Sequence, residues 1–390
     1  MTDAPLGVGA GRHRGGPPAD TDADQTAPRR RSRRVLILAI ALGAVLIAGG
    51  GTATALILTH HHHAPPVTAS APPPQTASPP TPVLSSSLPA PSPSPSLSVG
   101  PAGWSLPKPI DQQAYQNDEA VINSVSCVTA AECFAVDSDG DILSAAAVNS
   151  WQTVTTAASA NFTSISCPSA QFCAAVDNSG DVILFSGGTW SDPISIDSGN
   201  ELTGVSCPTS AFCMAVDNQG DGFMFTGSAT SWSRVTVDPN QDTISSVSCP
   251  SVNFCAAVDQ SGNVYSYDGS SWDSSDSIDN GAELTQVSCY NDTFCAAIDN
   301  NGNAAIMTNG DWSVGSTPTT ETGISCPAAG YCVAVDNSGG ALVYQQGSWS
   351  KAAKIDGNNN FEAISCVAVN TCTATDQYDN VTYYTPASSG

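Results

Sequence analysis

The chain has 390 residues and a formal net charge of −24 at pH 7, although only 12% of its residues are charged. Seven of its 11 basic residues precede Val35, so the part from Ala64 onward carries four basic residues against 31 acidic ones. A surface of that charge repels phosphate backbones and attracts cations, amines and basic partners, so we expect no nucleic-acid partner.

The N-terminal part predicts a cytoplasmic segment followed by a membrane span. Residues 1–34 are rich in Gly, Pro, Asp and Arg, which predicts a disordered segment. Residues 35–59 contain no charge and are long enough for one transmembrane helix, with the preceding arginines on the cytoplasmic side. We therefore expect a single-pass protein of the cell membrane whose C-terminal bulk is extracellular.

Removal of this segment as an export signal is the alternative. The triplet Ala69-Ser70-Ala71 resembles a late cleavage site, and SRRVLIL at 32–38 resembles a twin-arginine signal. The apolar stretch is longer than a typical signal core. The twin-arginine route also carries proteins that fold in the reducing cytosol, which fits poorly with many disulfides. These points favour an uncleaved anchor.

Residues 60–103 predict a stiff linker. The first four are histidines, which can chelate a metal weakly, but no acid or cysteine nearby completes a site. The remainder is Pro, Ser, Thr and Ala in low-complexity order (APPPQTASPPTP, PAPSPSPS), a composition that cannot bury a core. A polyproline stalk on the order of 100 Å long would lift a domain away from the membrane.

From Trp104 to about Thr385 the chain is a repeat marked by paired cysteines. The first cysteine of each pair recurs at spacings of 40, 40, 42, 40, 37 and 40 residues, and the second always follows six positions later. One unit contains four β-type runs (FTSISC, FCAAVD, DVILFSG and WSDPISID) separated by turn residues. This period and this content predict an all-β fold, a seven-bladed β-propeller of four-stranded blades over residues 104–385.

Each cysteine pair spans the loop between the first two strands of a blade. The ends of a hairpin loop lie close enough for disulfide geometry, so local pairing is the simplest connectivity. Zinc would need four ligands, and no histidine follows His63. We expect Cys127–Cys133, Cys167–Cys173, Cys207–Cys213, Cys249–Cys255, Cys289–Cys295, Cys326–Cys332 and Cys366–Cys372.

Small residues recur in the first two strands, with Ser before every first cysteine and Ala two positions after every second one. Strands crowded around a propeller axis favour such residues, so these should be the inner strands. Six tryptophans follow the third strand of a unit and should pack between blades, but the last unit has none. The upstream run WSLPKPID matches WSDPISID, so Trp104 and its strand should complete the last blade and close the ring.

The repeat W…I-D…(I/V)-S…A-V-D-x-x-G-x-V-x-x-Y-x-G-x-x-W resembles tectonin-type propeller repeats, over residues 104 to about 385. It is also similar to repeats of exported bacterial propellers of unassigned role. The resemblance implies a propeller and glycan binding. The cysteine pair in every blade departs from the tectonin pattern.

An aspartate stands four residues after each second cysteine and should accept amide hydrogen bonds in a turn. These turns share a face with the crossovers between blades, which also carry acids (Asp197 and Glu201, Asp238 and Asp242, Asp279 and Glu283, Asp356 and Glu362). A negative funnel that attracts cations or amines is the functional hypothesis. Its candidate ligand-binding residues are Asp137, Asp177, Asp217, Asp259, Asp299, Asp336 and Asp376.

The sequence predicts no resident cofactor, with calcium as the alternative. The run DSDGD at 137–141 resembles part of a calcium loop but lacks the distal Glu of the twelve-residue pattern. No catalytic constellation is visible either, because residues 104–390 contain no histidine and a single arginine, Arg234. We therefore expect a non-enzymatic recognition module for cell-envelope glycan or a protein partner. A sensor or scaffold subunit of a membrane complex and a carboxylate-based glycoside hydrolase are the alternatives.

Overall fold

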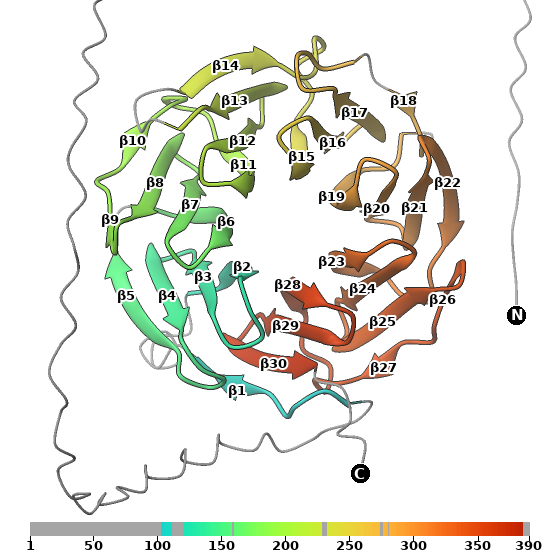
Figure 1. Ribbon diagram of the computed structural model, residues 1–390. Coiled ribbons are helices and arrows are strands. Elements are labelled where there is room, and N and C mark those ends of the chain that lie inside the picture. The colour runs from blue at the N-terminus through green and yellow to red at the C-terminus, as the bar shows by residue number, and fades with distance from the viewer. Residues whose placement is uncertain are drawn as a thin grey trace, which may run out of the picture. The chain divides into compact units, whose positions relative to one another are not determined.

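The computed structural model describes residues 103–110, 120–157, 160–227, 232–273, 276–279 and 281–384. These residues form seven antiparallel sheets arranged around one axis, which confirms the all-β seven-bladed propeller (Figure 1). The predicted disordered segment, membrane span and linker lie outside the described residues, except for Gly103, the last residue of the linker. Within the described ranges, no helix has the length and apolar character needed to cross a bilayer.

Each blade runs from the axis outward in chain order, so the first strand is innermost (Figure 1). The innermost strands are β2 (Ile122–Cys127), β6 (Phe162–Ser169), β11 (Leu202–Thr209), β15 (Ile244–Ser251), β19 (Leu284–Asn291), β23 (Glu321–Ala328) and β28 (Phe361–Ala368). The second strands are β3 (Cys133–Asp137), β7 (Phe172–Asp177), β12 (Phe212–Asp217), β16 (Phe254–Asp259), β20 (Phe294–Asp299), β24 (Tyr331–Asp336) and β29 (Thr371–Asp376).

The third strands are β4 (Asp141–Ala145), β8 (Asp181–Ser186), β13 (Asp221–Phe225), β17 (Asn263–Tyr267), β21 (Asn303–Thr308), β25 (Gly340–Gln345) and β30 (Asn380–Tyr384). Single outer strands are β5 (Gln152–Thr156), β14 (Trp232–Thr236), β18 (Asp276–Ser277) and β22 (Asp311–Ser316). In blades 2 and 6 the outer position is divided between β9 (Thr189–Trp190) and β10 (Ile194–Ser195), and between β26 (Ser348–Trp349) and β27 (Ala353–Lys354). Pro193, which lacks a ladder donor, precedes β10.

The inner strand of blade 2 is longer than the sequence indicated. Pro168 was expected in a loop, but β6 continues through it to Ser169, and the loop is reduced to two residues. The pairing register shifts between Ser166 and Ser169, which marks a bulge. Because a bulge leaves a residue outside the ladder, the missing proline N–H costs no hydrogen bond there.

The N-terminal strand closes the ring as predicted. Strand β1 (Lys108–Pro109) pairs with β30 and supplies the outer strand of blade 7. Trp104 forms a bridge to Tyr384, and their rings stack with centroids 5.0 Å apart. Trp104 is only 2% exposed and packs in the apolar cluster between blades 6 and 7. The orphan tryptophan of the sequence thus fills the gap in the last blade.

Seven apolar clusters hold the blades together, one between each neighbouring pair. Every second strand is almost wholly buried, and its small Ala residues lie where the blades converge. The tryptophans pack between blades as expected: Trp190 contacts Phe134 of the preceding blade and Phe185 of its own. Apolar contact on both sides of each sheet therefore stabilises the ring.

The invariant serines form a closed ring of hydrogen bonds between blades. In each case the backbone N–H of the first cysteine of one blade donates to the serine hydroxyl of the preceding blade, at 2.9–3.0 Å. These bonds join Cys127 to Ser365, Cys167 to Ser126, Cys207 to Ser166, Cys249 to Ser206, Cys289 to Ser248, Cys326 to Ser288 and Cys366 to Ser325. Crowding alone would also allow Ala, so the hydroxyl explains why Ser is used.

All seven predicted disulfide bonds are present, each between cysteines six positions apart, and no described cysteine is free. They lie at the ends of the loops that connect the first and second strands, so all seven are on one face of the ring. Each closes a short local loop and restricts the unfolded chain.

Candidate functional site

The two faces of the ring differ in charge. We call the face with the loops after first and third strands the disulfide face, and its described loops contain four acids (Glu132, Asp268, Asp273 and Asp292) and no base. The acidic face carries the turns after second strands and the crossovers between blades. It holds all seven turn aspartates and both acids of each predicted crossover pair. The predicted concentration of acids on one face is therefore seen in the described residues.

The seven turn aspartates are structural acceptors in the turns where the sequence placed them. In every blade, the Oδ1 atom accepts the backbone N–H groups of the residues two and four positions later, as Asp177 does from Ser179 and Asp181, both at 2.9 Å. The same pair of bonds recurs in the other six blades. All seven residues are at most 3% exposed. As ligand-binding residues they remain a prediction, because their main contacts are with their own turns.

A crossover aspartate is fixed against the turn of its own blade. The backbone N–H of Asp197 donates to the carbonyl of Gly180 at 3.0 Å, and Asp356 repeats this with Gly339 at 3.1 Å. Gly180 has φ +86°, and a Cβ there would lie 1.8 Å from the Asp197 carbonyl oxygen. Glycine is thus required both for the turn and for the close approach of the crossover.

The crossover aspartate then reaches the turn aspartate of the next blade. Burial, together with the contact between Asp197 and Asp217, raises the pKa of Asp217 to about 6. Burial and the contact with Asp299 raise the pKa of Asp279 to about 6. Burial and the contact with Asp376 raise the pKa of Asp356 to about 7. We call these contacts the carboxyl pairs of junctions 2/3, 4/5 and 6/7.

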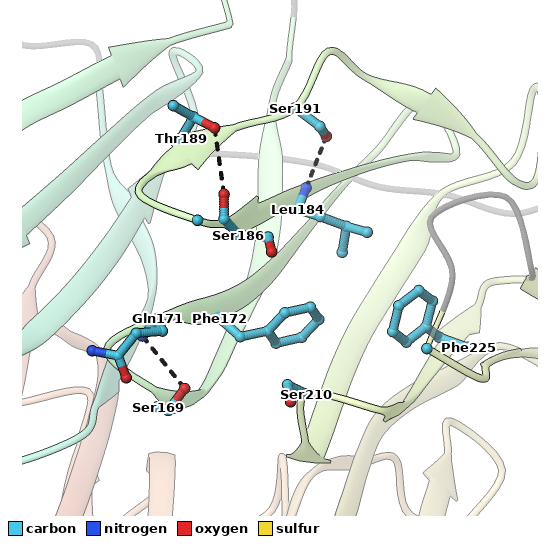
Figure 2. A pocket seen from close by; sticks show the side chains of 11 residues that line it. Ser169, Gln171, Phe172, Leu184, Ser186, Thr189, Ser191, Ser210 and Phe225 are labelled. Atoms are coloured by element: carbon cyan, nitrogen blue, oxygen red, sulfur yellow. Dashed lines mark hydrogen bonds between the residues drawn. The ribbon is translucent and has the colours of Figure 1, made fainter.

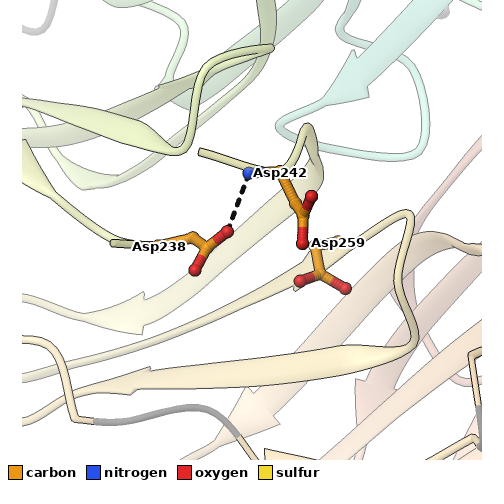
Figure 3. A group of neighbouring side chains, drawn as sticks. All are labelled: Asp238, Asp242 and Asp259. Carbon is orange, nitrogen blue, oxygen red and sulfur yellow. Dashed lines mark hydrogen bonds between the residues drawn. The ribbon is translucent and has the colours of Figure 1, made fainter. Parts of the chain in front are cut away.

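Junction 3/4 gathers three acids whose oxygens lie within 4.8 Å of one another, namely Asp238, Asp242 and Asp259 (Figure 3). Among the described residues, this is the acidic group close enough to suggest a cation, and DSDGD at 137–141 is not part of it. Its oxygens already accept hydrogen bonds: Asp238 from the amide of Asp242 at 2.8 Å, and Asp259 from the Tyr265 hydroxyl at 2.9 Å. The group is thus satisfied by donors of the protein itself.

The second acids of the crossovers lie just before or at the start of inner strands, and Asp242 among them also belongs to the junction 3/4 group. We call Glu201, Asp242, Glu283 and Glu362 the mouth carboxylates; all four are half-buried. Asn300 donates to Glu283 at 2.9 Å and Asn360 to Glu362 at 2.6 Å, but these amides are neutral. Burial, and the charge of Asp376, raise the pKa of Glu362.

The few cations near this face do not neutralise the mouth carboxylates. Arg234 on the outer strand β14 pairs with Asp221, and the Lys354 ammonium donates to the Ser338 carbonyl. None of the seven inner strands contains Lys or Arg. An arc of carboxylates from blade 3 to blade 7 is therefore left for a positively charged partner.

A groove between blades 2 and 3 contains no charged residue. It has a volume of about 510 Å³ and is lined by Ser, Thr and Gly residues around Phe172 and Phe225, whose centroids are 6.0 Å apart (Figure 2). The two phenylalanines are only 6% and 2% exposed, so the groove presents hydroxyl groups more than aromatic faces. Its Ser169 and Ser191 hydroxyls already bond the amides of Gln171 and Leu184.

Comparison with known proteins supports the fold. No protein-family model and no curated protein matches the sequence. Similar solved structures are YCF48 bound to D1 peptide (TM-score 0.57, 15% identity, 70% of this chain and 94% of that one) and YCF48 from Cyanidioschyzon merolae (0.59, 13%, 73% and 99%). The WD40 β-propeller domain of Doa1 is a third (0.58, 12%, 70% and 94%). At these identities the likeness shows the propeller fold alone, and the tectonin-like repeat stays a resemblance.

Sequence analysis identified both acids of each crossover pair but did not predict that the first and second acids lie in different environments. The structure buries Asp197, Asp238 and Asp356 against turn aspartates, whereas the mouth carboxylates stay partly open. It also adds Glu321, a buried acid whose oxygens accept the hydroxyls of Thr317 and Thr319. The sequence did contain a signal for Glu321: the inner strand of every other blade begins with Phe, Leu or Ile, and only blade 6 has an acid at this position.

Proposed function

We propose that this protein is a non-enzymatic binding module, displayed outside the cell on a membrane anchor, whose acidic face takes a basic segment of a partner protein. The observation that carries this proposal is the arc of mouth carboxylates, which has no basic residue in the described inner strands beside it. Opposite charge on an extended lysine- or arginine-rich segment would complement this arc.

The structural neighbours support protein binding over the alternatives. YCF48, a propeller of the same fold, has been solved with a peptide bound. Glycan binding finds less support, because the rings in the groove between blades 2 and 3 are buried and cannot stack broadly on a sugar. A hydrolase finds less support because the turn aspartates are engaged in backbone hydrogen bonds.

The test is binding of a fluorescein-labelled peptide of alternating lysine and serine to residues 104–390, oxidised. Neutralising the mouth carboxylates together (Glu201→Gln, Asp242→Asn, Glu283→Gln, Glu362→Gln) should weaken binding about 30-fold, since each exposed ion pair contributes about 0.5 kcal/mol. Fluorescence anisotropy gives the Kd. Affinity should also fall as salt rises from about 50 to about 300 mM.

The control removes the same charge from the disulfide face (Glu132→Gln, Asp268→Asn, Asp273→Asn, Asp292→Asn). It should change the Kd by less than about 3-fold, because screening separates the two faces. An equal loss in both variants would show attraction to net charge alone. A glycan array that captures the protein while the lysine peptide does not bind would favour the glycan alternative and overturn the proposal.

Membrane display is a second part of this proposal, supported by seven disulfide bonds, which persist in oxidising compartments. A tag after Gly390 should be accessible to antibody on intact cells, and a tag before Met1 only after permeabilisation. Loss of residues 35–59 should release the protein into the medium or the cytosol. A C-terminal tag that is reached only after permeabilisation would contradict the extracellular orientation.

A further inference from the structure

The contact of two acids across a blade junction has no obvious role in binding. At junction 6/7, Asp356 is 5% exposed and Asp376 is fully buried, so both carboxyl groups are largely removed from water. The Asn359 side-chain amide bridges them, donating to Asp356 Oδ1 at 3.3 Å and to Asp376 Oδ2 at 3.2 Å. The Oδ2 atom of Asp356 has no hydrogen-bond donor among the described residues.

Junction 2/3 repeats this arrangement. Asp217 is fully buried and Asp197 is 8% exposed. The Asn200 amide donates to Asp197 at 3.1 Å, while Asp217 Oδ2 has no donor among the described residues. At junction 4/5, Asp299 is fully buried, whereas the Asp279 in contact with it is half-buried. Two ionised carboxylates in contact, with at least one of them buried, repel each other, and a positive group between them removes this repulsion.

Three other junctions differ in the groups that face the turn aspartate. At junction 3/4 the Tyr265 hydroxyl donates to Asp259 and supplies the hydrogen itself. At junction 5/6 the buried acid is Glu321, which begins β23 opposite Asp336 and accepts hydrogen bonds from the hydroxyls of Thr317 and Thr319. At junction 1/2 the crossover residue is Ala157, whose amide bonds Gly140 as the crossover aspartates bond their glycines.

Donors around the pairs favour a proton over a metal ion as the positive group. The Asn380 side-chain amide donates to Asp376 Oδ2 at 2.8 Å and the Asn303 amide to Asp299 Oδ2 at 2.7 Å, so oxygens that a cation would bind already accept hydrogen bonds. Other charges face the junctions as well: Arg234 with Asp221 near junction 2/3, Glu283 through Asn300 near junction 4/5, and Glu362 near junction 6/7. Only Arg234 is positive, and it is engaged by Asp221.

We propose that junctions 2/3, 4/5 and 6/7 each hold one proton between their two carboxyl groups, so that the ring tightens on acidification and loosens when these protons are lost. The proton makes one carboxyl a donor to the other and converts a repulsive contact between blades into a hydrogen bond. This property belongs to the scaffold and does not depend on the proposed function.

The direction of the pH effect follows from proton linkage. Burial and the neighbouring carboxyl raise the pKa of Asp217 and Asp279 to about 6 and that of Asp356 to about 7. For Asp299, burial acts to raise the pKa, but hydrogen bonds from Asn303 and from Asp279 hold it below its usual range. The folded ring thus binds more protons than the unfolded chain between about pH 4 and pH 7, and its stability falls as pH rises through that window.

Thermal unfolding of residues 104–390 tests the proposal. The Tm should fall by about 5–10 °C from about pH 5 to about pH 8. The variant Asp197→Asn, Asp279→Asn, Asp356→Asn should lose at least half of this fall and gain Tm at about pH 8, because each amide donates permanently to its partner. At about pH 5 the infrared C=O band of un-ionised carboxyl groups should be stronger in the native protein than in this variant, and the difference should disappear as the pH rises to about 8.

A charge-matched control separates the pairs from net charge. The variant Asp139→Asn, Asp192→Asn, Asp292→Asn removes three exposed acids and should keep the native pH dependence. Conversely, Ala157→Asp should create a fourth pair at junction 1/2 and steepen it. Equal flattening in both triple variants, or no band of un-ionised carboxyl, would overturn the proposal. So would a rise in Tm with calcium at about pH 8 that the pair variant lacks, since it would place a cation at the junctions.

Discussion

Reduction of all seven disulfide bonds should leave the propeller unfolded at room temperature and neutral pH. Each bond joins cysteines six positions apart, and closing so short a loop stabilises a protein by about 2 kcal/mol in the chain-entropy account. Seven such bonds add about 15 kcal/mol, which equals the whole free energy of unfolding of many domains. Tryptophan fluorescence and circular dichroism, followed at neutral pH before and after complete reduction without denaturant, measure the effect.

A single bond provides the graded control. Replacing Cys249 and Cys255 together by Ala should cost about 2 kcal/mol in urea unfolding and leave the ring folded, because six other bonds remain. A fully reduced protein that still unfolds cooperatively at high denaturant would show that the apolar clusters suffice, and that the bonds serve another purpose.

Trp104→Ala should destabilise the ring by about 3–5 kcal/mol, the usual range for a large buried aromatic. Its side chain is 2% exposed, stacks on Tyr384 and packs between blades 6 and 7. The substitution therefore removes a core contact and weakens the strand that closes the ring at the same time. Urea unfolding, with the m-value as a check that the same surface is exposed, gives the free energy.

Trp190→Ala is the matched control, since this residue is half-buried between blades 1 and 2 and does not take part in closure. It should cost about 1–2 kcal/mol, in proportion to its smaller buried area. If both variants lost the same free energy, Trp104 would be an ordinary packing residue. Increased hydrogen exchange in blade 7 of Trp104→Ala alone would instead locate the loss at the closing strand.

Much of the ring could be predicted because its determinants are local and repeated. The cysteine period fixed the number of blades, and the six-residue separation within each pair implied the disulfides. WSLPKPID resembled the outer run of blade 2, which placed Trp104 in the last blade. The turn aspartates were also correctly assigned to turns, because Asp and Gly at this spacing satisfy backbone amides within a few residues.

The roles of the acids and serines were harder to predict because they depend on neighbouring blades. Ser166 was expected for its size, whereas its hydroxyl accepts an amide 41 residues away. Asp197 and Glu201 are four residues apart and looked equivalent, yet Asp197 is buried against Asp217 whereas Glu201 is half-buried just before β11. Such differences arise when sheets pack, and no pattern within a single unit contains that information.

The closing strand has a mechanical consequence. If a partner bound to the acidic face pulls against the residues before Gly103, the force acts on the ring through β1. This strand has only two residues paired with β30. That short ladder and the Trp104 stack would yield first under tension. The seven inner hairpins, each locked by its own sulfur bond, would stay intact, so the module would stretch at its tether and recover without unfolding its blades.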